Sequence, residues 1–170
     1  MTEGSFPLLG QLAGGTEFHL GPITHYFSFL SGLIFGRTPA AFAYPDLTFS
    51  VLAIPLTYVL IAKMFSKNMG LASAFLMAIS GFMVSYGRFQ WNPNTMPFFI
   101  LLFILSAQSV AYERENRRNR VVWAAALGIS IGVGVQLHTF LLILLPILTL
   151  ALFVFLAVTH SFSKWILQLS

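Results

Sequence analysis

Long apolar runs with very few charges dominate the sequence and determine the solvent in which it can fold. Hydrophobic residues make up 57% of the 170 residues and charged residues only 8%, whereas about a quarter of the residues in a soluble domain are charged. Such a chain has too little polar surface to face water along most of its length. The composition therefore predicts an all-α polytopic membrane protein, with one membrane domain over residues 1–170.

The apolar runs predict about five transmembrane helices within residues 46–158. A span needs about 20 apolar residues to cross a hydrocarbon core of about 30 Å. Residues 23–36 form an aromatic run that is shorter than this, which predicts an interfacial (juxtamembrane) helix after an external loop, so that residues 1–45 precede the spans. Residues 159–170 are expected to form a cytoplasmic amphipathic tail. The expected spans are Asp46–Met64, Gly70–Tyr86, Thr95–Tyr112, Val121–Leu137 and Thr139–Val158.

The placement of lysine and arginine predicts the orientation in the membrane. Only Arg37 and Arg88 lie on the side that carries the N-terminal segment and His138. Because cytoplasmic loops carry the excess of basic residues, that side is expected to face outward. The connections after the first, third and fifth spans hold the other basic residues: Lys63, Lys67, Arg114, Arg117, Arg118, Arg120 and Lys164.

Several classes of chemistry are excluded or disfavoured by what the sequence lacks. There are no cysteines, which excludes disulfides, thiolate metal sites and cysteine nucleophiles. His19 and His25 lie six residues apart across a Gly-Pro bend and match no metal-ligand spacing, so we expect neither a metal nor a cofactor. The basic loop at residues 113–120 is interpreted as a topology determinant, and no nucleic-acid partner is expected.

The connection SYGRFQWNPNTMPFF, residues 85–99, is far more polar than a membrane hairpin requires. Arg88 lies there at the outer surface, where an arginine near hydrocarbon is costly without a partner. Its guanidinium matches phosphate oxygens. A simpler interpretation leaves Arg88 among lipid headgroups, Trp91 as an interfacial anchor and Asn92 as a helix cap. The density of polar groups in Gln90, Trp91, Asn92 and Asn94 favours a phosphate or sugar site.

Three other residues, His25, Tyr26 and His138, are weaker candidates on residue type alone. His25 and Tyr26 lie beside the Gly-Pro bend, where a solvated loop with rings at headgroup level is the simpler interpretation. His138 ends the fourth span and is more simply a helix-end hydrogen-bonding group. Asp46 begins the first span and is interpreted as an N-terminal helix charge.

Taken in order, the outer-face stretches resemble a known family. The sequence is similar to bacterial membrane glycosyltransferases of the GT-C type, the group of protein O-mannosyltransferases and the lipid A aminoarabinose transferase. This resemblance implies a multi-pass protein of the bacterial plasma membrane that transfers a sugar from a polyprenyl-phosphate-linked donor to an acceptor on the extracytoplasmic face. It is carried by FPLLG (6–10), HLGPITHYF (19–27), YGRFQWNPNTMPFF (86–99) and GVQLHTFLLILLP (134–146).

The resemblance also implies roles for particular residues. In the family, arginines near the membrane surface hold the phosphate of the carrier lipid, which makes Arg88 the candidate here. Trp91, Asn92 and Asn94 would line the same cavity. Tyr26 and His25 would lie at its mouth, with His138 as a more distant member.

The family pattern further implies that a spanning helix and a catalytic aspartate precede FPLLG, and Met1 falls after both. We therefore expect the catalytic aspartate upstream of Met1, assign no catalytic residue, and expect a shortened or split enzyme that is inactive without its remainder. Its expected partners are the lipid-linked sugar, membrane lipids and that remainder. The alternative is a non-enzymatic membrane protein, a scaffold or half of a transporter, which the small-residue face Gly128, Gly132 and Gly134 favours.

Overall fold

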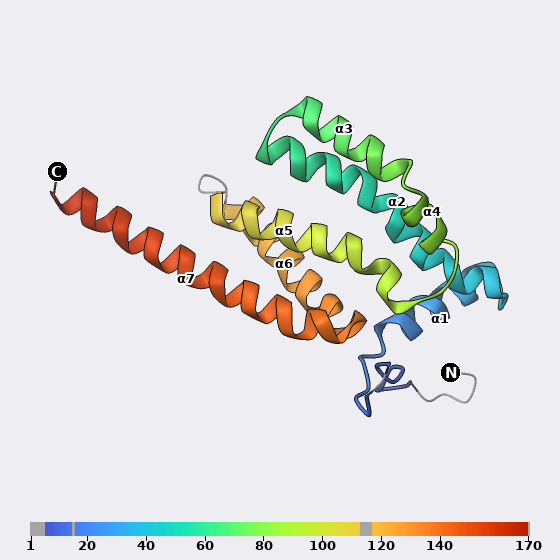
Figure 1. Ribbon diagram of the computed structural model, residues 1–170. Coiled ribbons are helices and arrows are strands. Elements are labelled where there is room, and N and C mark those ends of the chain that lie inside the picture. The colour runs from blue at the N-terminus through green and yellow to red at the C-terminus, as the bar shows by residue number, and fades with distance from the viewer. Residues whose placement is uncertain (1–5, 15, 113–116, 170) are drawn as a thin grey trace.

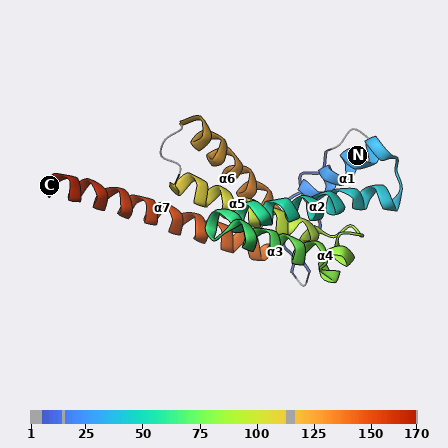
Figure 2. The ribbon, with the colours of Figure 1, turned by 90° about the horizontal axis from the view of Figure 1, so that it is seen from above.

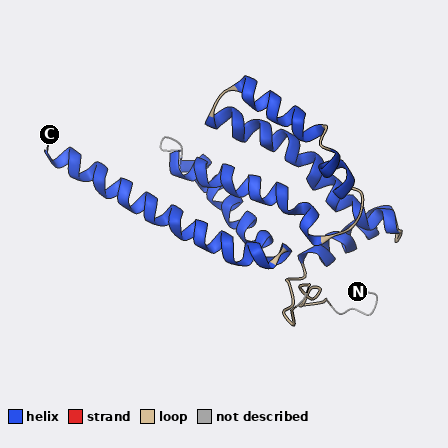
Figure 3. Cartoon of the chain, in the orientation of Figure 1, coloured by secondary structure: helices blue, strands red, loops and turns tan. Residues whose placement is uncertain are grey.

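The computed structural model describes residues 6–14, 16–112 and 117–169, and within these residues the regular structure is helical apart from one isolated bridge, Leu12 to His19 (Figure 3). The elements in chain order are α1 (Ile23–Phe35), α2 (Pro39–Met64), α3 (Lys67–Ala78), α4 (Gly81–Tyr86), the 3-10 helix η1 (Asn92–Thr95), α5 (Met96–Tyr112), α6 (Arg117–Leu137) and α7 (Thr139–Leu169).

The long helices run up and down, so that the connections gather at two ends (Figure 1). The turn from α2 to α3, the end of α5 and the start of α6 lie at one end, with Lys63 and Lys67 beside that turn. The N-terminal segment, α1, α4, η1 and the turn from α6 to α7 lie at the other. The view from above shows the same separation, with α1 and α4 far from the C-terminus (Figure 2). Arg88 and most of the described lysines therefore occupy opposite ends, as the predicted orientation requires.

The predicted fold class, an all-α polytopic membrane protein, is confirmed. Among the described residues, three helices are long and apolar enough to cross a membrane: Pro39–Met64, Asn92–Tyr112 and Arg118–Leu137. Two shorter apolar helices, Ile23–Phe35 and Thr139–Phe155, accompany them. The first of these matches the short helix expected over residues 23–36, and its placement in the membrane interface stays a prediction.

Two of the expected helix bounds are wrong. The helix expected over Gly70–Tyr86 is interrupted, because α3 ends at Ala78 and the Ser80 side chain caps a new helix by accepting from the Met83 amide. The 12 residues of α3 rise only about 18 Å at 1.5 Å per residue. The helix expected from Asp46 begins earlier, at Pro39.

Thr38 explains that earlier start of α2. Its hydroxyl accepts a hydrogen bond from the Ala41 amide at 3.1 Å, and Pro39 follows in the first helical position, a combination that favours helix initiation. Asp46 consequently lies about two turns inside the helix. Its interpretation as an N-terminal helix charge is therefore wrong.

Apolar packing holds the helices together. Phe103, Leu127, Leu141 and Leu145 form a buried cluster that joins α5, α6 and α7. A second cluster joins α1, α2 and α5 through the rings of Phe27, Phe49, Phe98 and Phe99, with the Phe49 ring centroid 5.2 Å from that of Phe27 and 5.0 Å from that of Phe99. These contacts hold α1 and the start of α2 against the end of the bundle that carries the polar loop.

Two expectations fall partly outside the described residues. The polar turn at residues 113–120 includes residues 113–116, and the amphipathic character of residues 159–170 depends on side chains beyond the described set. The backbone of α7 is helical through Leu169.

Two glycines with different surroundings, one at the contact between α2 and α3 and one without close neighbours, allow a test of helix packing. A Cβ on Gly70 would lie 2.9 Å from the Tyr58 carbonyl oxygen and 3.0 Å from the Ala62 Cβ, whereas a Cβ on Gly128 would meet nothing within 4 Å. We expect Gly70→Ala to lower the free energy of unfolding by about 1–3 kcal/mol by forcing α2 and α3 apart. Gly128→Ala should leave it equal or raise it by up to about 1 kcal/mol through helix propensity. Thermal unfolding in one detergent measures both, and equal effects of the two variants would contradict this packing.

Candidate functional site

The loop from Gly87 to Thr95 folds into a defined structure at one end of the bundle. The Asn94 side-chain amide donates to the Phe89 carbonyl at 2.7 Å, and the Asn94 backbone amide donates to the Trp91 carbonyl at 2.9 Å. Gln90 extends to α1, where its amide donates to the Ser28 hydroxyl at 2.5 Å. Internal bonds and a bond to a neighbouring helix therefore both fix the loop.

The predicted site residues of this loop separate into two groups by burial. Asn92 and Asn94 are only 5% and 6% exposed and point into the protein. Trp91 is 46% exposed and lies in an aromatic cluster, with its ring centroid 5.8 Å from that of Tyr86 and 6.3 Å from that of Phe89. The two asparagines shape the loop from inside, while Trp91 presents its ring at the surface.

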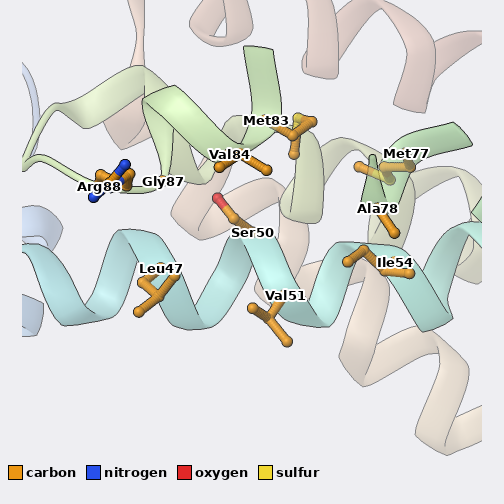
Figure 4. A pocket seen from close by; sticks show the side chains of 10 residues that line it. All are labelled: Leu47, Ser50, Val51, Ile54, Met77, Ala78, Met83, Val84, Gly87 and Arg88. Carbon is orange, nitrogen blue, oxygen red and sulfur yellow. The ribbon is translucent and has the colours of Figure 1, made fainter. Parts of the chain in front are cut away.

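Arg88 lies at one end of an apolar groove between α2 and the α3–α4 segment (Figure 4). The groove has a volume of about 400 Å³. Within residues 6–14, 16–112 and 117–169, no hydrogen bond or ion pair engages the Arg88 guanidinium. The groove is lined by Leu47, Ser50, Val51 and Ile54 of α2, by Met77, Ala78, Met83 and Val84 of α3 and α4, and by Gly87 and Arg88.

A second hollow of about 200 Å³ adjoins the groove and shares Leu47, Gly87 and Arg88 with it. Its other walls are Ala40, Ala43 and Tyr44 in the first turns of α2. The guanidinium therefore stands where a mostly apolar groove meets a second recess. This arrangement suits a ligand with an anionic group near Arg88 and an apolar chain along α2.

Asp46 lies on another face of α2, beneath the same loop, and the sequence did not single it out as a site residue. It is 5% exposed and accepts a hydrogen bond from the Trp91 backbone amide. Its position could have been found from the Thr38-Pro39 start signal, which places Asp46 inside the helix instead of at its end. An acidic residue inside an apolar helix is costly unless a polar group bonds it, and the loop supplies such a group.

Tyr26 and His25 lie on α1 at the same end of the molecule. The Tyr26 hydroxyl donates to the Pro7 carbonyl at 2.8 Å, and the Tyr26 ring packs against Phe6 with ring centroids 6.5 Å apart. His25 is half-buried. Tyr26 thus holds the N-terminal segment against α1, close to where the loop meets that helix through Gln90.

His138 lies in the turn from α6 to α7, at the same end as the loop (Figure 1). Its side chain is exposed, and its Nδ1 accepts a hydrogen bond from the Phe140 backbone amide at 3.1 Å. This bond satisfies an amide at the start of α7, which confirms the interpretation as a helix-end group. A role for His138 in substrate binding stays a prediction.

In the described part of the chain, no group of three or more histidine, aspartate or glutamate side chains comes together that could hold a metal ion. The candidate site is thus an arginine, an apolar groove and a rigid loop. Its components are suited to binding and orienting a charged lipid.

Comparison with known protein families matches most of the chain. The family model described as dolichyl-phosphate-mannose-protein mannosyltransferase matches residues 19–169. No curated protein and no solved structure matches the chain. The matched region contains Arg88, the groove and the loop.

The buried amide of Asn94 provides a test of the loop structure. Because Asn94 holds the Phe89 carbonyl from inside the loop, we expect Asn94→Ala to lower the free energy of unfolding by about 1–3 kcal/mol. Ser85→Ala, an exposed position just before the loop, is the matched control and should change it by no more than about 0.5 kcal/mol. Thermal unfolding in detergent measures both variants, and an unchanged midpoint for Asn94→Ala would contradict this loop geometry.

Proposed function

The chain belongs to the dolichyl-phosphate-mannose-protein mannosyltransferase family of membrane glycosyltransferases, and from that membership we propose that it binds a polyprenyl-phosphate-linked sugar for transfer to an acceptor. The observation that carries this proposal is the position of Arg88 at one end of an apolar groove of about 400 Å³. A lipid-linked sugar combines a phosphate with a long hydrocarbon chain, and the groove offers a partner for each.

The groove fits the hydrocarbon chain because its walls are almost entirely aliphatic or thioether side chains. Ile54 of α2 faces Ala78 and Met77 across the groove (Figure 4), and Val51 also lines it. Methionine adapts its shape to irregular apolar ligands. Burying isoprenoid surface there is favoured by about 25 cal/mol per Å² when the chain would otherwise meet water, while in a membrane the groove competes with lipid and supplies mainly shape.

Arg88 supplies the polar half of the site. A guanidinium can donate two parallel hydrogen bonds to phosphate oxygens, and such charge-assisted bonds are about twice as strong as neutral ones. In sugar transfer the acceptor forms a bond to the anomeric carbon and gives up a proton to a base, while the bond between that carbon and the phosphate oxygen breaks and the phosphate leaves with an additional negative charge. An arginine already on that phosphate stabilises the developing charge, which is the usual way a preorganised cation accelerates such a step.

We propose supporting roles for the other predicted residues. Asn92 and Asn94 set the shape of the loop from inside, and Trp91 covers the sugar side of the cavity from the surface. Tyr26 and His25 flank the mouth on α1, and His138 lies in the neighbouring turn. None of these residues is assigned as a catalytic acid or base.

We also propose that transfer occurs on the extracytoplasmic face of a bacterial plasma membrane. Lys63 and Lys67 lie at the end of the bundle opposite Arg88, and basic residues mark the cytoplasmic side of membrane proteins. The lipid phosphate at Arg88 would then lie at the outer leaflet.

Replacing Arg88 tests the proposed function directly. Arg88→Ala should weaken binding of a polyprenyl phosphate to the chain in nanodiscs by about 10- to 100-fold, because a charged hydrogen bond contributes about 1.5–3 kcal/mol. Arg88→Lys should retain part of the affinity, since lysine keeps the charge but loses the planar fork. Thermal unfolding of each variant shows whether the fold is intact.

Arg37 is the matched control for this experiment. It is also exposed, and it lies in the turn between α1 and α2, on the same side as Arg88. Arg37→Ala should leave lipid binding within about two-fold of the unmodified chain, because Arg37 does not line the groove. Unchanged lipid affinity in a folded Arg88→Ala variant would overturn the proposed phosphate site.

A larger side chain in the groove tests the proposed path of the hydrocarbon chain. Ala78→Phe should reduce the affinity for a long-chain polyprenyl phosphate by about 5- to 50-fold, because the ring fills space between Ile54 and Met77. Affinity for a phosphate with a short isoprenoid chain should change little, since that chain would end before Ala78. Leu76→Phe, on an exposed part of α3, is the control. Equal loss for long and short chains would place the hydrocarbon elsewhere.

A further inference from the structure

A small polar cavity lies beneath the loop, apart from the groove that holds Arg88. Its walls come from α1, α2, η1 and the loop, and it has a volume of about 10 Å³. Besides Thr95, whose buried hydroxyl donates to the Asn92 carbonyl at 3.4 Å, three of its polar side chains are almost completely buried: Thr24 is 7% exposed, and Asp46 and Asn92 are each 5% exposed. Each comes from a different helix, so the cavity is the point where three elements meet.

Two of these three side chains have buried polar atoms without a partner among the described residues. They are the Thr24 hydroxyl oxygen and the Asn92 side-chain nitrogen. An unsatisfied buried polar group is destabilising, which is why such groups in folded proteins are nearly always bonded to protein or to ordered water. The Asp46 carboxyl group accepts from the Trp91 amide and has further acceptor positions available.

The size of the cavity and its polar groups match one ligand in particular. A cavity of about 10–15 Å³ holds one water molecule, provided that two to four polar partners surround it. A water there accepts a hydrogen bond from the Asn92 amide, donates one to the Asp46 carboxyl group and bonds the Thr24 hydroxyl. We propose that one internal water bridges Thr24, Asp46 and Asn92, and that this bridge fixes the loop that carries Arg88.

The bridge reaches Arg88 through the backbone. Trp91, whose amide bonds Asp46, is three residues after Arg88, and Asn92 follows directly. On the other side, Gly87 packs against α2, where a Cβ would meet the Ser50 hydroxyl oxygen at 3.0 Å. Arg88 therefore lies on a short segment held at both ends. In this arrangement Thr24 and Asp46 are positioning residues that act through the loop.

Substitution of Thr24 distinguishes a hydrated cavity from a dry one by the sign of its effect. If the water is present, Thr24→Val removes one of its partners and should lower the unfolding midpoint by about 2–6 °C. In a dry cavity the same change removes an unsatisfied hydroxyl at constant shape, and the midpoint should rise or stay unchanged. Thr24→Ser, which keeps the hydroxyl, should restore most of the loss. A midpoint that rises or does not change in Thr24→Val overturns the bridge.

Thr48→Val is the matched control for this substitution. The Thr48 hydroxyl donates to the Tyr44 carbonyl of its own helix at 2.8 Å and is exposed, so its removal should shift the midpoint by less than about 1 °C. A shift as large as that of Thr24→Val would assign the effect to threonine removal in general and would also overturn the bridge.

Backbone hydrogen exchange tests whether the bridge fixes the loop. Peptides that cover residues 86–95 should exchange about ten-fold faster in Thr24→Val than in the unmodified chain, because loss of the bridge raises the population of the open loop. Thr24→Ser should restore the slow exchange, and peptides from α6 should not change. Unchanged exchange in the loop would overturn its control by the bridge.

The consequence for lipid binding rests on the proposed function. If Arg88 holds the lipid phosphate, Thr24→Val should weaken polyprenyl phosphate binding by about 3- to 10-fold, and Thr24→Ser should restore it. Unchanged affinity in Thr24→Val, where Arg88→Ala weakens binding, would overturn the positioning role. An Arg88→Ala variant with normal affinity would instead refute the proposed function, and the midpoint and exchange measurements would still decide whether the bridge exists.

Discussion

The hydrogen bond from the Trp91 amide to the Asp46 carboxyl group joins the polar loop to the helix beneath it. A carboxyl group 5% exposed in an apolar helix is tolerated only when polar groups approach it. The loop provides such a group, and in doing so it is drawn across the end of α2. Arg88, which precedes Trp91 by three residues, is thereby directed along a neighbouring face of the same helix, where the groove begins.

The apolar contacts that pack the helices and the polar side chains of the candidate site occupy different parts of the molecule. The middle of the bundle is held by apolar contacts such as those of Phe103 with α6 and α7. The polar side chains for which a binding role is proposed lie at one end, from Tyr26 on α1 to His138 before α7. Transporters place their substrate sites near the midplane of the membrane, whereas a site at one end suits an enzyme that works on a lipid headgroup. Of the three glycines on α6, Gly134 packs against Leu145 of α7, whereas a Cβ on Gly128 or Gly132 would meet nothing within 4 Å among the described residues.

Local patterns predicted much of the fold but little of the site. The short helix at residues 23–36 and the spans that end at Tyr112 and Leu137 could be predicted, because long apolar runs and clear polar ends define them. Thr38 and Pro39 also signal the start of α2, whereas the charge of Asp46 points to a later start. The inward orientation of Asn92 and Asn94 could not be predicted, because it depends on contacts with helices distant in sequence, and no local pattern encodes such contacts.

The interruption between α3 and α4 shows why a feature that the local sequence pattern does not predict matters for function. Ser80 and Gly81 look like members of a small-residue face on one continuous helix, yet the Ser80 hydroxyl caps α4 and ends the earlier helix. The groove wall uses Met77 and Ala78 before this break and Met83 and Val84 after it. On a straight helix Met77 and Val84, seven residues apart, would share a face, but Met83 would point roughly 120° or more away from Met77 and Ala78, so one face could not present all four to α2. The break bends the chain so that both short helices line the groove and the second delivers Arg88 to its end. Here the departure from regular helix geometry forms the candidate site, in keeping with the general tendency of functional sites to break local rules.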